Sequence, residues 1–68
     1  MIENTYTVTG MTCDHCVRSV TEEVSALDGV TGVSVDLPTG SVTVASDKEV
    51  GVAEVRAAVE EAGYQLTA

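Results

Sequence analysis

The feature that most constrains this chain is the stretch Gly10–Cys16, which spells GMTCDHC. It contains both cysteines, the only histidine and one of the two methionines, so almost all of the soft metal ligands lie in this stretch. A chain of 68 residues is close to the size at which a hydrophobic core only just offsets the entropy lost on folding. We therefore expect residues 1–68 to form a single domain whose elements support this stretch.

Cys13 and Cys16 are separated by only two residues. A bridge between them would close almost no loop and add little stability, whereas small secreted scaffolds usually carry several long-range disulfides. The first residues lack the basic and apolar regions of a signal peptide, and no apolar run approaches the roughly 18 residues of a membrane span. We therefore expect a cytoplasmic protein without direct membrane insertion, whose Cys-x-x-Cys pair binds a metal or takes part in redox chemistry.

The charges are strongly biased, because eleven acidic residues face three basic ones and give a formal net charge of −8. Nucleic acids and anionic membrane surfaces are bound by clustered Lys and Arg side chains. The chain has no such cluster, so we expect no nucleic-acid partner. A partner with a basic face fits better, although the charge also serves simply to keep a small protein soluble.

Hydrophobic periodicity predicts the secondary structure of the first half of the chain. Alternation over Glu3–Thr9 indicates a strand, and apolar residues at spacings of three and four predict a helix from about Cys16 to Leu27. Thr12 and Asp14 are both candidate N-caps of this helix. The cysteine stretch should therefore lead directly into the start of a helix.

The second half predicts a hairpin, a second helix and a final strand. Residues 33–37 and 41–44 alternate on either side of Pro38-Thr39-Gly40, whose proline and glycine suit a tight turn. The next helix should bury Val52 and end before Gly63. It should begin after Gly51 as its N-cap or, alternatively, earlier at Ser46. Residues 64–67 alternate again, which predicts a final strand. The order predicts a ferredoxin-like α+β sandwich, a four-stranded antiparallel sheet with two helices on one face and a core of valine and alanine.

The ligand inventory separates the chemistries open to the cysteine pair. A structural zinc site needs four protein ligands and an iron–sulfur cluster normally needs four cysteines, but no Cys or His lies outside residues 13–16. Dithiol redox catalysis stays open, because thioredoxin-like enzymes also place Cys-x-x-Cys at a helix start. Soft thiolates favour Cu(I), for which two or three ligands suffice. A helix N-terminus lowers the pKa of a thiol, so the thiolates that bind the metal form more readily. An ion with only two ligands can be attacked by a thiolate of another protein, which favours transport of Cu(I) over catalysis.

The pattern Gly-Met-x-Cys-x-x-Cys after a first strand resembles the heavy-metal-associated domain family, and the Ala62-Gly63-Tyr64 ending looks like the family's closing motif. Within it the chain resembles bacterial copper chaperones and the amino-terminal metal-binding domains of copper-transporting P-type ATPases. The resemblance implies a copper chaperone rather than an enzyme, which holds Cu(I) on Cys13 and Cys16 and passes it to such an ATPase or another copper protein. Alternatives are a mercury-binding or zinc/cadmium-binding member of the family, or a small dithiol oxidoreductase.

The resemblance also implies roles for the residues around the cysteines. Met11 matches a methionine that points inward and supports the loop, and Tyr64 matches a tyrosine close to the metal in bacterial copper members. Thr12 stands where zinc-handling members often have an acidic residue, which favours copper. His15 is a candidate third ligand, although a solvent-facing position is the simpler interpretation. The sequence leaves open whether the chain is free-standing or a domain of a larger ATPase, and whether Cu(I) bridges two chains in a homodimer.

Overall fold

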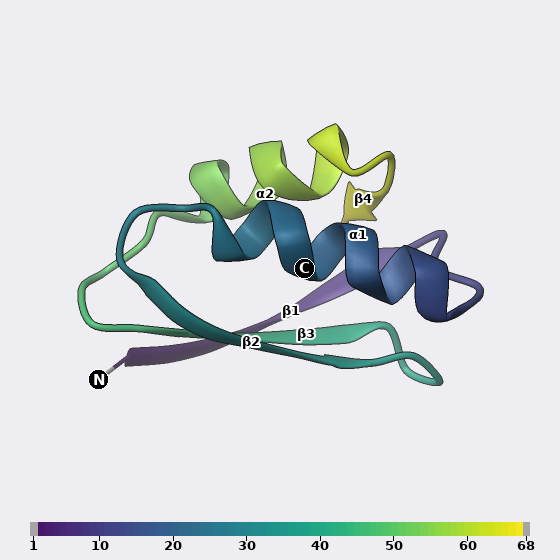
Figure 1. The fold of residues 1–68 in the computed structure, drawn as a ribbon, viewed down its shortest axis with the longest axis horizontal. Coiled ribbons are helices and arrows are strands. Elements are labelled where there is room, and N and C mark those ends of the chain that lie inside the picture. Colours follow the sequence, from purple (N-terminus) through teal and green to yellow (C-terminus); the bar gives the residue numbers. More distant parts are fainter. Residues whose placement is uncertain (1, 68) are drawn as a thin grey trace.

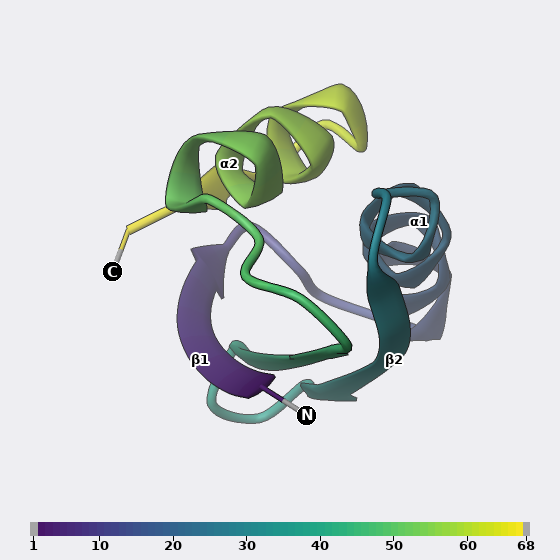
Figure 2. The same cartoon turned by 90° about the vertical axis from the view of Figure 1, so that its left-hand side faces the viewer.

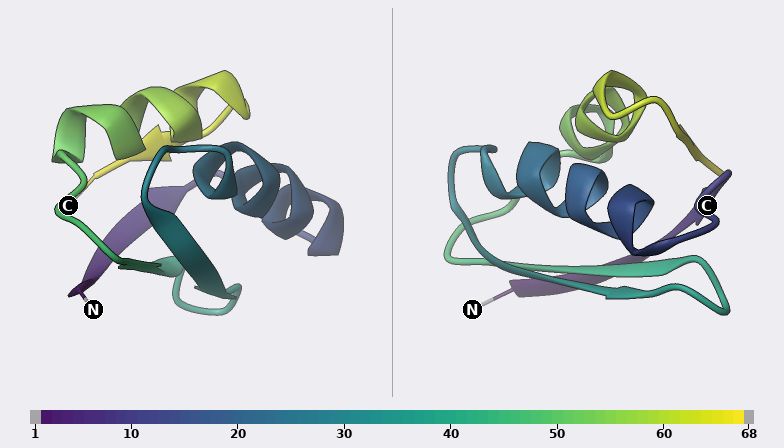
Figure 3. Two further views of the ribbon diagram at one scale, coloured as in Figure 1. Left: turned by 60° about the vertical axis from the view of Figure 1, so that its left-hand side comes forward. Right: turned by 45° about the vertical axis from the view of Figure 1, so that its right-hand side comes forward.

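A computed structural model of the chain describes residues 2–67 and contains strands and helices in the predicted order (Figure 1). The elements are β1 (Ile2–Thr9), α1 (Asp14–Ser25), β2 (Val30–Asp36), β3 (Ser41–Ser46), α2 (Val52–Glu61) and β4 (Gln65–Leu66). The sheet has the strand order β2-β3-β1-β4, and all of its pairings are antiparallel. Both helices cover the same face of this sheet (Figure 2 and Figure 3), which confirms the predicted ferredoxin-like sandwich. Within residues 2–67, neither helix is long and apolar enough to cross a membrane.

The core lies between the sheet and the helices and is built almost entirely of valine, as predicted. Val52 was expected to belong to it, but this prediction is wrong, because its side chain is 48% exposed. Val50, in the link before α2, is buried instead and closes that end of the core. The buried cluster consists of Val8, Val20, Val24, Val42, Val44, Val50, Val55, Ala58 and Val59.

The start of α1 differs from the prediction. The helix begins at Asp14 and ends at Ser25, and Cys13 is its N-cap in place of Thr12 or Asp14. Cys13 has an extended backbone, and its carbonyl oxygen accepts hydrogen bonds from the backbone N–H groups of Cys16 (3.0 Å) and Val17 (3.2 Å). No side chain caps this end. The cysteine loop therefore begins the helix through backbone contacts alone.

The turn between β2 and β3 is tied to β1 just before the cysteine loop. The backbone N–H of Gly40 donates to the carbonyl oxygens of Asp36 (2.8 Å) and Leu37 (3.3 Å), as expected for the predicted tight turn. Gly40 has a φ of 74°, and its own carbonyl oxygen accepts a hydrogen bond from the N–H of Val8 at 2.8 Å. Only glycine suits this position, because a Cβ on Gly40 would lie 2.6 Å from the carbonyl oxygen of Val8.

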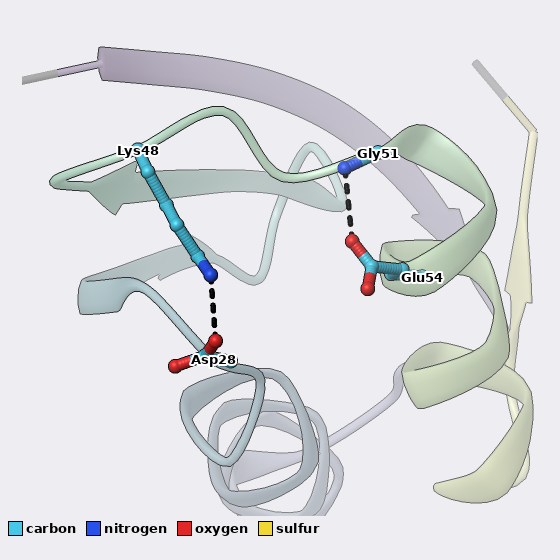
Figure 4. Close-up of polar contacts among 4 residues, drawn as sticks. All are labelled: Asp28, Lys48, Gly51 and Glu54. Carbon is cyan, nitrogen blue, oxygen red and sulfur yellow. Dashed lines mark hydrogen bonds and ion pairs between the residues drawn. The ribbon is translucent and has the colours of Figure 1, made fainter.

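The opposite end of the molecule is closed by the links before β2 and before α2. Lys48 Nζ donates to Asp28 Oδ2 at 2.6 Å (Figure 4), which raises the pKa of Lys48 and lowers that of Asp28. Both side chains are mostly exposed, so this ion pair contributes little stability. Beside it the N–H of Gly51 donates to the Glu54 carboxylate at 3.1 Å (Figure 4). Gly51 is therefore the N-cap of α2, as predicted, and the earlier start at Ser46 is wrong.

Candidate metal centre

The two cysteines lie where β1 leads into α1, at one end of the molecule (Figure 1). Cys13 caps the helix and Cys16 belongs to its first turn. This geometry places the two Sγ atoms 3.7 Å apart, and both thiols are free. The structure therefore brings together the two thiols that the sequence predicted to bind the metal.

The two thiols have different surroundings. Cys13 is exposed, whereas only 9% of Cys16 is exposed. The backbone of Thr12 and the side chain of Tyr64 both form hydrogen bonds to the Cys16 sulfur, and Thr12 Oγ1 lies 3.9 Å from it. Cys16 is therefore anchored by its neighbours, while Cys13 is presented to solvent.

These contacts lower the pKa of Cys16 from 9.0 to about 6. The largest cause is the hydrogen bond from the backbone N–H of Thr12, followed by that from the Tyr64 hydroxyl and by the hydrogen bonds from Cys13. Burial acts in the opposite direction and does not outweigh them. The same contact raises the pKa of Tyr64, because the phenol proton donates to the sulfur. At neutral pH Cys16 is therefore a thiolate, which is the form that binds metals.

The ultraviolet absorbance of the reduced, metal-free protein should show one thiolate titrating with a midpoint near pH 6. The Tyr64→Phe variant loses a hydrogen bond to the thiolate, so its midpoint should move toward 9.0, whereas Cys13→Ser should retain a midpoint well below 9.0. The pKa of Cys16 is lower in the folded chain than in the unfolded chain, so ionisation of this thiol stabilises the fold. The stabilisation is complete at pH values above the pKa of the unfolded chain. The stabilisation is lost as pH falls toward 6. If the lowest thiol titration midpoint of the unmodified protein were near 9.0, the anchoring of Cys16 by these hydrogen bonds would be contradicted.

The structure places the other predicted site residues in different surroundings. Met11 is half-buried and packs against the core, and Tyr64 comes from the far end of the chain to contact Cys16. His15 is exposed on the first turn of α1. Within the part of the chain that the structure describes, no three His, Cys, Asp or Glu side chains lie together as metal ligands. His15 therefore does not complete a three-residue ligand group with the cysteines.

Thr12 and Gly10 contribute to the site in ways that the sequence did not predict. Thr12 was expected to cap the helix, but its backbone and hydroxyl group contact Cys16. Gly10 has a φ of 94°, and a Cβ there would lie 3.3 Å from Tyr64 Cδ1. The glycine at position 10 is a signal in the sequence that another side chain packs closely against the backbone there. The contact from the Thr12 backbone has no such signal, because almost every residue type has a backbone N–H.

Comparison with known proteins identifies the family. Residues 5–65 match the model of the heavy-metal-associated domain. The chain belongs to the heavy-metal-associated domain family. This domain is 42% identical over 67 residues to the copper chaperone CopZ of Bacillus subtilis (strain 168), a match that covers 97% of each chain. The family predicted from the sequence is therefore confirmed.

Solved structures also resemble this heavy-metal-associated domain. A CopZ metallochaperone aligns with a TM-score of 0.91 and 34% identity, covering 97% of this chain and 100% of the other. The copper-binding domain of HMA7, a P-type ATPase, aligns with a TM-score of 0.89 and 31% identity, covering 98% of this chain and 92% of the other. The fold is therefore shared by chaperones and by ATPase domains.

Proposed function

We propose that this domain is a copper chaperone that holds one Cu(I) ion on Cys13 and Cys16. The observation that carries the proposal is the thiol pair, with its Sγ atoms 3.7 Å apart and Cys16 held as a thiolate by Thr12 and Tyr64. Two soft thiolates are a sufficient ligand set for Cu(I). The relative named as a copper chaperone and the similar copper-binding domain support copper as the metal.

The donor set favours Cu(I) over zinc and cadmium. A structural zinc site uses four protein ligands. Among residues 2–67, no third His, Cys, Asp or Glu side chain joins the two cysteines. Mercury also binds soft thiolates, so it is the alternative that a metal-binding experiment has to include.

Delivery of the ion follows from the exposure of the site. Cys13 is exposed, so a thiolate of a partner can reach an ion held there and replace one ligand at a time. The partner in this proposal is a copper-transporting P-type ATPase, its metal-binding domain or another copper protein, and the exchange takes place in the cytoplasm. The same contact between two loaded copies would give a metal-bridged homodimer. This is a binding and transfer role in which the chain is not an enzyme.

A competition titration with a Cu(I)-specific chelator tests this function. The reduced protein should withhold one Cu(I) per chain from the chelator, and Zn(II) at equal concentration should not displace it. Displacement of Cu(I) by equimolar Zn(II), or failure to hold Cu(I) against the chelator in a protein that still binds Hg(II), would contradict the choice of metal. Rapid turnover of disulfide substrates with poor Cu(I) retention would favour a dithiol oxidoreductase in its place.

A further inference from the structure

The link between α1 and β2 contains the only Asp-Gly pair of the sequence, Asp28-Gly29. In such a pair the glycine nitrogen can attack the carboxyl carbon of the aspartate, and the attack is easier than in other Asp-x pairs because glycine has no Cβ to hinder it. The Asp28 side chain is 92% exposed, so neighbouring side chains do not shield its carboxyl group from water. This pair is therefore the place in the chain where backbone rearrangement is chemically easiest.

The rearrangement needs no reagent except water. The Gly29 nitrogen forms a bond to Cγ of Asp28, and the amide proton leaves with the carboxyl OH as water, which closes a five-membered succinimide ring. Water that opens the ring at Cγ restores aspartate. Water that opens it at the backbone carbonyl carbon leaves isoaspartate, in which the backbone runs through the former side chain. The carboxyl group must be neutral and must turn toward the Gly29 nitrogen, so a contact that keeps it ionised and turned elsewhere slows the reaction.

Lys48 makes such a contact from the link before α2. Its Nζ donates to Asp28 Oδ2 at 2.6 Å (Figure 4), and this hydrogen bond together with the lysine charge lowers the pKa of Asp28. The aliphatic part of the same side chain crosses Gly29, where an added Cβ would lie 2.7 Å from Lys48 Cγ and 2.8 Å from Lys48 Cε. Lys48 therefore holds the carboxylate and also covers the glycine whose nitrogen would attack it.

The backbone at this pair closes the end of the molecule opposite the thiols. The N–H of Val30 donates to the carbonyl oxygen of Leu27 at 3.2 Å, across a turn in which Gly29 has a φ of 92°. The N–H of Asp47 donates to the carbonyl oxygen of Gly29 at 2.9 Å and ties this turn to the link before α2. Isoaspartate would add one carbon atom to the backbone inside the turn, so these two hydrogen bonds could not both keep their geometry.

We propose that Asp28 is a site of spontaneous isomerisation to isoaspartate and that Lys48 protects it. The ion pair adds little stability to the fold, yet it lies on the one Asp-Gly pair of the chain. Its role is therefore to preserve the backbone of this turn. Modification of Asp28 would loosen the end of the core that Val50 closes.

Isoaspartate at residue 28 is measured by mass spectrometry of fragments from an endoprotease that cleaves before aspartate but not before isoaspartate. The reduced, folded protein is incubated at neutral pH, and circular dichroism checks that each variant is folded. Lys48→Met keeps the length of the side chain but removes its charge, and it should accumulate isoaspartate roughly two- to fivefold faster, as expected for loss of an exposed ion pair. Lys48→Arg keeps the charge and should match the unmodified protein. Arg18→Met, the matched control, loses the same charge on α1 and should also match it.

The same measurement in concentrated urea separates the folded contact from the sequence. There the unmodified protein and Lys48→Met should isomerise at one rate, faster than the folded unmodified protein, because the contact exists only in the folded chain. Protein that carries isoaspartate at residue 28 should unfold at a lower urea concentration. Four results would each overturn the proposal: equal rates in folded Lys48→Met and folded unmodified protein, equal acceleration in Arg18→Met, an unmodified protein that isomerises as fast folded as in urea, or an isoaspartate form of undiminished stability.

Discussion

Replacing both Cys13 and Cys16 with Ser should abolish tight Cu(I) binding. Hydroxyl groups are not soft ligands. The double variant would contain no cysteine, and its only histidine would be His15. We expect the affinity to fall by roughly a thousandfold or more, which corresponds to about 4 kcal/mol. Competition with a Cu(I)-specific chelator measures this loss, and circular dichroism checks that the variant remains folded.

The His15→Ala variant is the matched control within the same loop. His15 is exposed and forms no three-residue ligand group with the cysteines, so its affinity should stay within about twofold of the unmodified protein. Tight binding that survives in the double serine variant would contradict the assignment of the site. A loss of tenfold or more in His15→Ala would make His15 a third ligand, as one interpretation of the sequence suggested.

The Gly40→Ala substitution should destabilise the fold by roughly 2–4 kcal/mol. The φ of 74° strains any residue with a Cβ, and that Cβ would lie 2.6 Å from the carbonyl oxygen of Val8. Relieving the clash would also disturb the hydrogen bond from Val8 N–H to Gly40 O. A domain of this size has a free energy of unfolding of about 3–10 kcal/mol, so urea denaturation should show a large shift of the midpoint.

The Gly63→Ala variant separates backbone strain from the clash. Gly63 has a φ of 97°, but nothing lies within 4 Å of the Cβ that it would gain. We therefore expect a smaller loss of about 1–2 kcal/mol from strain alone. Equal losses at Gly40 and Gly63 would show that β1 moves away from the turn without cost, which would contradict a turn tied to β1.

Most of the fold could be predicted from local sequence patterns. Alternation and helical spacing identified every element, and Gly40, Gly51 and Gly63 correctly placed a turn, an N-cap and a helix end. The start of α1 was missed, because sequence rules look for a capping side chain and Cys13 caps the helix through its backbone alone. The spacing of Val52 matched the buried face of α2, but spacing does not reveal where the core ends.

The site was predicted less completely than the fold. The ligand inventory indicated Cys13 and Cys16 as the candidate ligands, because the sequence contains no other cysteine and only one histidine. Tyr64 was associated with the site only through the family resemblance, since no local pattern indicates that residues so far apart in the chain meet. The contact from the Thr12 backbone depends on the path of the loop rather than on residue type. Sequence patterns therefore indicate the candidate ligands, while the anchoring of Cys16 requires the three-dimensional structure.

Copper transfer between two proteins is the decisive experiment for a chaperone. The Cu(I)-loaded protein is mixed with an excess of the metal-free, metal-binding domain of a copper-transporting ATPase, the two are separated by ion exchange, and copper is measured in each. Copper should move to the acceptor, and an acceptor without its cysteines should receive none. Copper that stays on this chain in the presence of excess intact acceptor would contradict a role in delivery.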